Sequence, residues 1–340
     1  MSPRIEDTGV EPTAASGALS RPGRAAISSP FMRLIGRNAL WPLLIALVAA
    51  AEIVSHGAFL QPRNLINILA QNSVAGTLAV GQTLVILTGG IDLSLGSVTA
   101  LSSIVLLLLQ ESGALEARLA SLGVGLACGL LNGLLITIGR VPAFIATLGM
   151  MQGALGLAFV VSGGYPIYEN DHMALFGELD QIGPLPLIVM VWLALAIAAW
   201  IFLSRTRFGA YVYAIGGNER AARVSGVRTS RIKLLVYTIA GGCASIAGVI
   251  LVNRLGYTQP TIGASFTLDS IAPVVVGGTS LFGGVGGIWR TVGGVLVMGT
   301  LNNLMVLLGV NIYIEQAVQG IVVLAVVYCF INLRRTDEGS

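Results

Sequence analysis

The sequence has 340 residues, of which 55% are hydrophobic and only 10% are charged, with a net charge of +3 and a mean hydropathy of +0.84. Because soluble domains carry about 25% charged residues, this composition excludes a soluble enzyme, a disordered protein and a nucleic-acid-binding module. At roughly 20 residues per spanning helix, the length allows about ten spans. We therefore predict an all-α, polytopic membrane protein.

Ten apolar runs follow a polar N-terminal segment. Residues 1–38 are polar and contain many Pro, Ser and Arg residues, which predicts a disordered cytoplasmic tail. Each apolar run is a candidate span, and together they form a transmembrane domain over 39–332, followed by a C-terminal tail at 333–340. The runs cover residues 39–55, 66–88, 96–110, 119–138, 143–162, 185–203, 233–253, 268–282, 288–309 and 313–332.

The basic residues predict the orientation of these spans. With the N-terminus inside and ten crossings, 16 of the 19 Lys and Arg residues fall in cytoplasmic segments and 3 fall outside. This asymmetry follows the positive-inside rule and predicts that both termini are cytoplasmic. A signal peptide is the alternative, because the first run is short and follows Arg33 and Arg37. Its cleavage would leave nine spans and an external N-terminus.

The second and third runs are separated by a glycine-rich stretch, Gly89–Gly96, that contains Asp92. A carboxylate near the bilayer core is costly and suggests a function. Alternatively, Asp92 caps the helix that follows it by accepting backbone N–H bonds. The residues alone leave both interpretations open.

The long loop after the sixth run, residues 204–233, carries seven basic residues. Asn218 is a suitable N-cap for a two-turn helix that Gly226 would end, held between two glycine-flexed arms. Ala221, Ala222 and Val224 would form a small apolar face, which favours docking of another protein, although the arginines could instead only set topology and contact lipid phosphates. The candidate docking residues are Gly217, Asn218, Glu219, Arg220, Ala221, Ala222, Arg223, Ser225 and Gly226.

A second glycine-rich stretch, Gly277–Gly284, shares the pattern GG-x-[DS]-L-x-x-G with the first. Paired glycine-broken segments in the two halves of a chain are typical of transporter repeats and their substrate sites. Close packing through small residues is the simpler alternative. Uncharged polar residues in the spans would suit a neutral, hydroxyl-rich solute. The translocation-pathway candidates are Gln82, Gly89, Gly90, Asp92, Ser94, Gly277, Gly278, Thr279, Ser280, Asn302 and Asn303.

Several motifs are missing from the chain. No G-x-x-x-x-G-K-[ST] phosphate loop exists, and the sole lysine, Lys233, follows an isoleucine. Cys128, Cys243 and Cys329 have no CxxC spacing, and His56 and His172 are the only histidines. We therefore expect no ATPase site of its own, no catalytic residues, no metal and no cofactor.

Three motifs together resemble the permeases of ribose-type ATP-binding-cassette (ABC) importers. They are the run Val80–Ser97, the loop Tyr213–Val227 and the segment Val275–Gly286. The resemblance covers about residues 35–335. It implies a multi-pass protein of the bacterial inner membrane that works as a pair of permease copies and carries a monosaccharide or related polyol. It further implies a separate cytoplasmic ATPase docked on the loop, a periplasmic sugar-binding protein, and no nucleic-acid partner.

The resemblance also implies a mechanism, in which ATP binding closes the ATPase and moves the docking helix as a lever. A proton-driven secondary transporter of a small neutral solute, with Asp92 and Glu315 as relay groups, is the main alternative. A membrane scaffold without transport is a third possibility, although it would have no need of paired broken segments.

Overall fold

The computed structural model describes residues 40–170 and 181–337, so the predicted N-terminal tail lies outside the described residues. The described part is mostly helical, as predicted. It also contains four strands of two residues each, which the all-α prediction omitted: β1 (Ile167–Tyr168), β2 (Gln181–Ile182), β3 (Leu185–Pro186) and β4 (Tyr257–Thr258).

Each predicted apolar run overlaps one helix, and a further helix occupies the basic loop. The eighth run, 268–282, is helical only as far as Val276. The helices are α2 (Leu40–Val54), α3 (Pro62–Leu87), α4 (Leu95–Leu108), α5 (Ala114–Thr137), α6 (Ala143–Ser162), α7 (Leu187–Arg205), α8 (Arg207–Val224), α9 (Thr229–Leu255), α10 (Phe266–Val276), α11 (Ile288–Leu307) and α12 (Ile312–Asp337), with a 3-10 turn at Gln110–Ser112. The last helix thus continues beyond the predicted span into the C-terminal tail.

Membrane-crossing capacity is clear for half of the predicted spans. Among the described helices, α5, α6, α7, α9 and α11 are long and apolar enough to cross a bilayer, and α2, α4, α10 and the first part of α12 are shorter apolar helices. The structure therefore agrees with a polytopic membrane protein. The count of ten spans and the side on which each terminus lies stay predictions.

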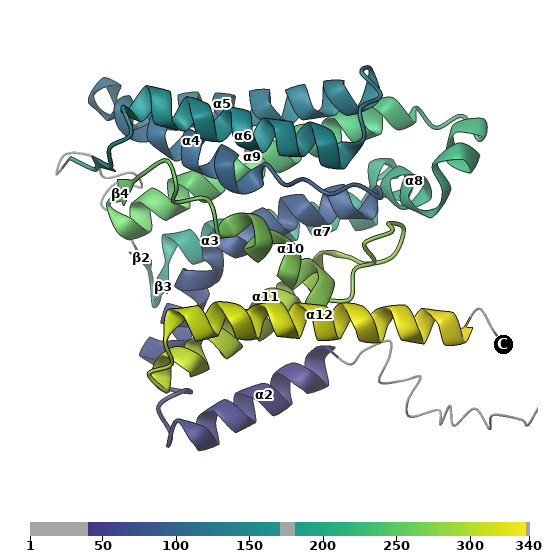
Figure 1. Ribbon diagram of the computed structural model, residues 1–340. Coiled ribbons are helices and arrows are strands. Elements are labelled where there is room, and N and C mark those ends of the chain that lie inside the picture. The colour runs from purple at the N-terminus through teal and green to yellow at the C-terminus, as the bar shows by residue number, and fades with distance from the viewer. Residues whose placement is uncertain (1–39, 171–180, 338–340) are drawn as a thin grey trace, which may run out of the picture. The chain divides into compact units, whose positions relative to one another are not determined.

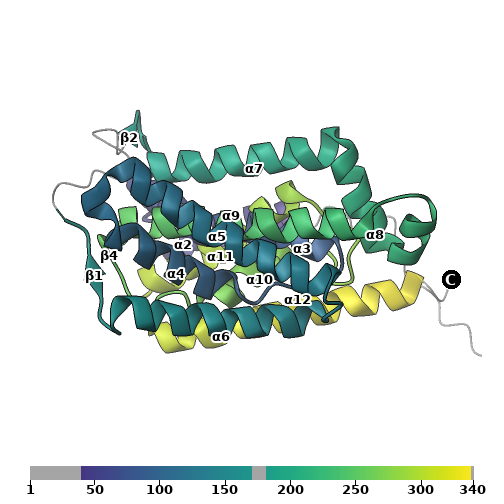
Figure 2. The same cartoon turned by 90° about the horizontal axis from the view of Figure 1, so that it is seen from above.

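Helix α9 runs through the middle of the bundle, against α3, α4 and α5 (Figures 1 and 2). Its contact with α5 depends on glycines spaced four residues apart. A Cβ at Gly125 would lie 2.4 Å from the Gly241 carbonyl oxygen, and a Cβ at Gly129 would lie 2.3 Å from the Tyr237 carbonyl oxygen. Small residues at this spacing let two helix backbones approach closely, which is how helices associate where lipid removes the hydrophobic driving force.

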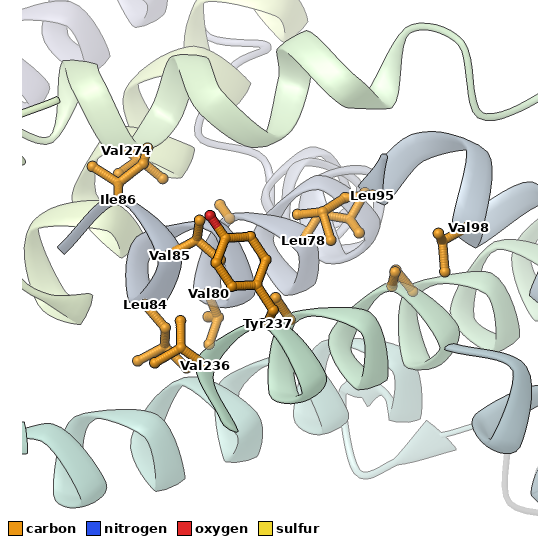
Figure 3. Close-up of a cluster of buried hydrophobic side chains, with 14 of the residues drawn as sticks. Leu78, Val80, Leu84, Val85, Ile86, Leu95, Val98, Val236, Tyr237 and Val274 are labelled. Atoms are coloured by element: carbon orange, nitrogen blue, oxygen red, sulfur yellow. The ribbon is translucent and has the colours of Figure 1, made fainter. Parts of the chain in front are cut away.

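Branched apolar side chains fill the space around α3. Leu78, Leu84 and Ile86 of α3 are at most 1% exposed, and Figure 3 shows them clustered with side chains from α4, α9 and α10. Helix α3 is therefore enclosed on several sides by other helices over its second half, and it carries the first glycine-broken segment at its end.

The strands lie at the end of the bundle away from α8 (Figure 2). Strand β1 pairs antiparallel with β4, and the rings of Tyr168 and Tyr257 lie 5.8 Å apart. Strand β2 pairs with β3 in the segment that leads into α7. The β1–β4 ladder thus connects the loop after α6 with the loop after α9.

We predict that Gly129→Ala destabilises the protein because its new methyl group would displace the α9 backbone. The expected loss is about 1–3 kcal/mol, as for other overpacked positions, and it is measured as a lower melting temperature of the purified protein. Gly123→Ala in the same helix is the matched control, since a Cβ there would meet nothing within 4 Å. Equal melting temperatures for the two variants would contradict the close packing of α5 on α9.

Candidate functional site

Helix α8 consists of two parts that meet at Asn218. That residue has φ −161° and ψ 102°, which are not helical. Its Oδ1 atom accepts a hydrogen bond from the Ala221 N–H at 2.9 Å, as an N-cap does. Beyond Val224, Gly226 adopts a φ of 88°, a conformation that commonly ends helices. The short capped helix predicted from the sequence is confirmed.

The prediction of two glycine-flexed arms around this helix is wrong on the first side. The chain is helical from Arg207 up to the cap, because Gly216 is used for close packing and not for a turn. The predicted apolar face is also narrower than expected. Ala222 is only 6% exposed, whereas Val224 is 85% exposed and Ala221 is exposed beside it.

Glu219 ties the short helix to α9. Its carboxylate accepts hydrogen bonds from Arg223 at 3.1 Å and from Lys233 of α9 at 2.5 Å. Partial burial raises the pKa of the Glu219 carboxyl, but the hydrogen bonds and charges of Lys233 and Arg223 outweigh it, so this pKa lies below its usual value. The carboxylate is therefore charged at neutral pH and holds both cations.

Gly216 lies where α8 meets both glycine-broken segments. A Cβ at Gly216 would lie 1.9 Å from the Leu87 carbonyl oxygen and 2.3 Å from the Gly284 nitrogen. The Gly284 N–H itself donates to the Leu87 carbonyl at 3.1 Å. A Cβ at Gly283 would lie 2.8 Å from the Gly89 nitrogen. We call this contact between residues 87–89, 216–217 and 283–284 the glycine junction.

The second broken segment, between α10 and α11, is a compact turn. The Ser280 N–H donates to the Val285 carbonyl at 2.8 Å, and Thr279 and Ser280 are each 2% exposed. A Cβ at Gly277 would lie 2.2 Å from the Arg290 carbonyl oxygen. Positive φ angles, which favour glycine, occur at Gly278, Gly283, Gly284 and Gly286. The two stretches that share a sequence pattern are thus in contact, although their conformations differ.

The first broken segment is held by polar side chains around Asp92, which is 1% exposed. The Asp92 Oδ1 atom accepts from the Ser94 N–H at 2.8 Å and from the Ser94 hydroxyl at 2.6 Å. Asn132 of α5 donates to the Ser94 hydroxyl at 2.9 Å. With its amide oriented to bond, Gln82 of α3 donates to the Asp92 carbonyl at 3.2 Å and accepts from the Asp92 N–H at 3.3 Å.

These contacts give Asp92 a structural role just before α4. The N-cap residue of α4 is Ser94, and Asp92 bonds its backbone two residues on, as an aspartate does in a local turn. Asp92 is therefore not itself the N-cap, yet it orders the turn that leads into the helix. Gln82, Asp92 and Ser94 come together in one network, as three of the predicted pathway residues.

Two cavities lie beside predicted site residues. The first, of about 480 Å³, is lined by the backbone at Gly89 and Gly90 together with Arg140, Glu219, Lys233 and Tyr237. The second, of about 170 Å³, is lined by Arg254, Asp269, Asn302, Glu315 and Gln319. Asn302, Asp269 and Glu315 thus share one polar cavity formed by α3, α9, α10, α11 and α12.

The two neighbouring asparagines of α11 have different surroundings. Asn302 accepts a hydrogen bond from Gln319 of α12 at 2.8 Å, beside the second cavity. Asn303 exchanges two hydrogen bonds of 2.9 Å with Asn64 of α3. Asn303 therefore joins two helices, and Asn302 is the one that lines a cavity.

Comparison with known proteins identifies the family of the chain. Residues 64–327 match a family model described as "Branched-chain amino acid transport system / permease component". The chain is 46% identical to the ribose import permease protein of Escherichia coli K12 over 292 residues, which is 84% of this chain and 91% of that protein. It is 46% identical to the ribose import permease protein of Bacillus subtilis over 290 residues, 84% of this chain and 89% of that protein. The fructose import permease protein of Rhizobium meliloti is 36% identical over 280 residues, 79% of this chain and 78% of that protein.

The chain belongs to the ribose-type ABC importer permease family. No solved structure matches it. Membership makes it a multi-pass protein of the bacterial inner membrane and a transport subunit. The resemblance predicted from the three motifs is therefore confirmed.

Two features of this permease were missed in the sequence. The glycines that pack α5 on α9 form the pattern Gly125-x-x-x-Gly129-x-x-x-Gly133, a recognisable signal for helix contact. Tyr237 also escaped notice, because nothing local distinguishes it from any other aromatic residue of a span. Its position beside the first cavity depends entirely on how α9 packs.

We predict that Asp92→Asn retains the turn before α4, whereas Asp92→Ala loses it. Asparagine keeps an oxygen for the Ser94 N–H, and it loses only the oxygen that accepts the long 3.5 Å hydrogen bond from Asn132. Alanine leaves the turn N–H unsatisfied, which costs about 1–3 kcal/mol. Melting temperatures and solute uptake test this. Loss of uptake in a stably folded Asp92→Asn variant would show that the ionised carboxylate has a role beyond the turn.

We also predict that Gly216→Ala disrupts the glycine junction by pushing α8 away from the two broken segments. The added methyl group would meet the Leu87 carbonyl oxygen, which cannot move without shifting α3. The expected loss of stability is about 1–3 kcal/mol, read as a lower melting temperature. Gly217→Ala is the control, because a Cβ at the adjacent glycine would meet nothing within 4 Å. An unchanged melting temperature for Gly216→Ala would rule out the junction as described.

Proposed function

We propose that this permease translocates a monosaccharide, a pentose, a hexose or a related polyol, into the cell and takes its energy from a separate ATPase. Two observations support the substrate class: relatives that are 36–46% identical are named ribose and fructose import permeases, and the polar cavity near Asn302 offers hydroxyl-binding groups. The lack of a phosphate loop in the sequence supports an external source of energy.

The exposure of Val224 is the observation that carries the docking proposal. A β-branched apolar side chain that is 85% exposed gains free energy when a partner covers it. Ala221 lies one turn earlier on the same face, and Arg220 is exposed next to it. The end of α8 thus offers a small apolar patch with a basic rim, suited to a groove on a cytoplasmic ATPase subunit.

The glycine junction supports a route from this docking site to the membrane. A displacement of α8 moves Gly216, whose backbone contacts both Leu87 of the first broken segment and Gly284 of the second. Because these backbones are in direct contact, a movement of α8 must either move the two broken segments with it or break its contact with them. We propose that this is how ATP binding switches the permease between inward-open and outward-open states.

The remaining partners follow from the same proposal. A periplasmic sugar-binding protein delivers the solute, and a second permease copy completes the pathway. The proton-coupled alternative requires Asp92 and Glu315 to act as relay groups, whereas Asp92 is bonded to Ser94 and Glu315 lines the separate cavity near Asn302. The orientation that places α8 in the cytoplasm is the one predicted from the basic residues.

The docking proposal is tested with Arg220→Glu and Val224→Asp combined in one variant. Arg223 is left unchanged, because it bonds Glu219 within the chain and its loss would disturb the helix. We expect the ATPase to no longer co-purify with the variant and ATP-driven sugar uptake to fall, because the patch loses its apolar group and its positive charge.

Arg228→Glu is the matched control, since it changes the same charge outside the short helix. It should leave co-purification intact. If the double variant retains both the ATPase and uptake, docking on α8 is refuted. Uptake by the permease without any ATPase would refute the proposed source of energy.

A further inference from the structure

The cavity next to α8 has a chemistry that sugar translocation does not use. Three cationic side chains line it, from the turn after α5 (Arg140), from α8 (Arg223) and from α9 (Lys233), with Glu219 as the only carboxylate in its lining. Its volume of about 480 Å³ accommodates a small organic molecule. A neutral monosaccharide needs hydrogen bonds but no such excess of positive charge.

Not every cationic side chain in this cavity has an anionic partner. Glu219 is shared between Arg223 and Lys233. Arg140, by contrast, makes no hydrogen bond or ion pair within the part of the chain that the structure describes, and it occupies the tip of its turn with a φ of 54°. One carboxylate therefore faces three cations, which leaves two positive charges for an anion to balance.

A buried hydroxyl without a partner lies at the same cavity. Tyr237 is 1% exposed, and its Oη atom has no hydrogen-bond partner among the described residues. Figure 3 shows the hydroxyl directed from α9 toward Val85 of α3. A Cβ at Gly90 would lie 2.3 Å from this oxygen, so only glycine leaves room for it. Buried hydroxyls normally have a partner, and a ligand oxygen would supply one.

We propose that this cavity binds a phosphate ester of a small polyol, with Arg140 and Lys233 holding the phosphate and Tyr237 donating to a ligand oxygen. Arginine and lysine are the usual phosphate-binding side chains. The hydroxyls of Thr137 and Ser230 also line the cavity and suit the polyol part. As far as it names a sugar phosphate, the inference rests on the proposed function, because ATP-dependent phosphorylation is the class of reaction that turns an imported monosaccharide into such an ester.

Occupancy would add a further connection between parts of the permease that are already joined by the α5–α9 packing, the Glu219–Lys233 pair and the glycine junction. The ligand would contact the turn after α5, the docking helix α8, helix α9 and the first broken segment at Gly89 and Gly90. A molecule bound to all four restrains their relative movement. Accumulated sugar phosphate would thereby slow further import, as feedback acting on the membrane subunit itself.

Binding is tested with the full chain in phosphatidylcholine nanodiscs by titration calorimetry. The probes are ribose 5-phosphate, ribose and inorganic phosphate. We expect ribose 5-phosphate to bind at least about tenfold more tightly than ribose, as charge-assisted contacts to phosphate would give. Arg140→Gln and Tyr237→Phe should each weaken its binding about fivefold or more, and both should fold, since one change is on the surface and the other removes only a hydroxyl. Arg231→Gln, an exposed cation of α9 outside the cavity, is the control and should bind normally.

The source of the phosphate is distinguished by repeating the titration in phosphatidylglycerol nanodiscs. Both titrations are run at high ionic strength, so that the anionic surface does not repel the probe. A loss of ribose 5-phosphate affinity in phosphatidylglycerol then supports the phosphate site and assigns it to a lipid headgroup, whereas unchanged affinity supports the site with a soluble ester. The proposal is overturned if ribose 5-phosphate does not bind the folded wild type, or if its binding is unaffected by both Arg140→Gln and Tyr237→Phe. This measurement needs no ATPase and no transport. A failure to bind ribose 5-phosphate would therefore not refute the proposed function, and a failure of sugar uptake would not refute the phosphate site.

Discussion

Backbone-to-backbone contact at Gly216 is the constraint on which the rest of this permease depends. The Leu87 carbonyl, the Gly284 N–H and the α8 backbone approach so closely that no side chain fits between them. In a bilayer, helices gain little by excluding lipid from apolar surfaces, so association relies on close packing and hydrogen bonds. The glycine junction therefore joins both halves of the bundle to the helix proposed to receive the ATPase.

The segment around Asp92 meets a second requirement of membrane proteins, the satisfaction of every broken backbone bond. Interrupting the helix between Leu87 and Leu95 exposes N–H and carbonyl groups at a buried position. Gln82 and Asp92 satisfy backbone groups there, and Asn132 holds the Ser94 hydroxyl. An amide or carboxylate in a span can thus be explained by the need to stabilise a broken helix before it is assigned to a solute.

The region around α8 combines three roles in a small volume. Val224 is exposed and is the proposed docking group, Gly216 contacts the broken segments, and Glu219 links the helix to Lys233 of α9. The phosphate cavity proposed here opens between these same elements. A ligand in it would act on the docking helix directly, which is why regulation at this place needs no additional domain.

The sequence by itself determined the helices, the capped turn and the family. Apolar runs predict spans because the bilayer sets their length and composition locally, and Asn218 predicts a cap because its bond reaches only three residues along the chain. Packing between distant segments decided the rest. Three features depend on which helices become neighbours. They are the burial of Ala222 beside the exposed Val224, the bonds of Gln82 to the Asp92 backbone, and the contact of Tyr237 with Gly90. Local periodicity carries no information about such neighbours. A glycine in a span looks the same in the sequence whether it faces open space or the backbone of another helix.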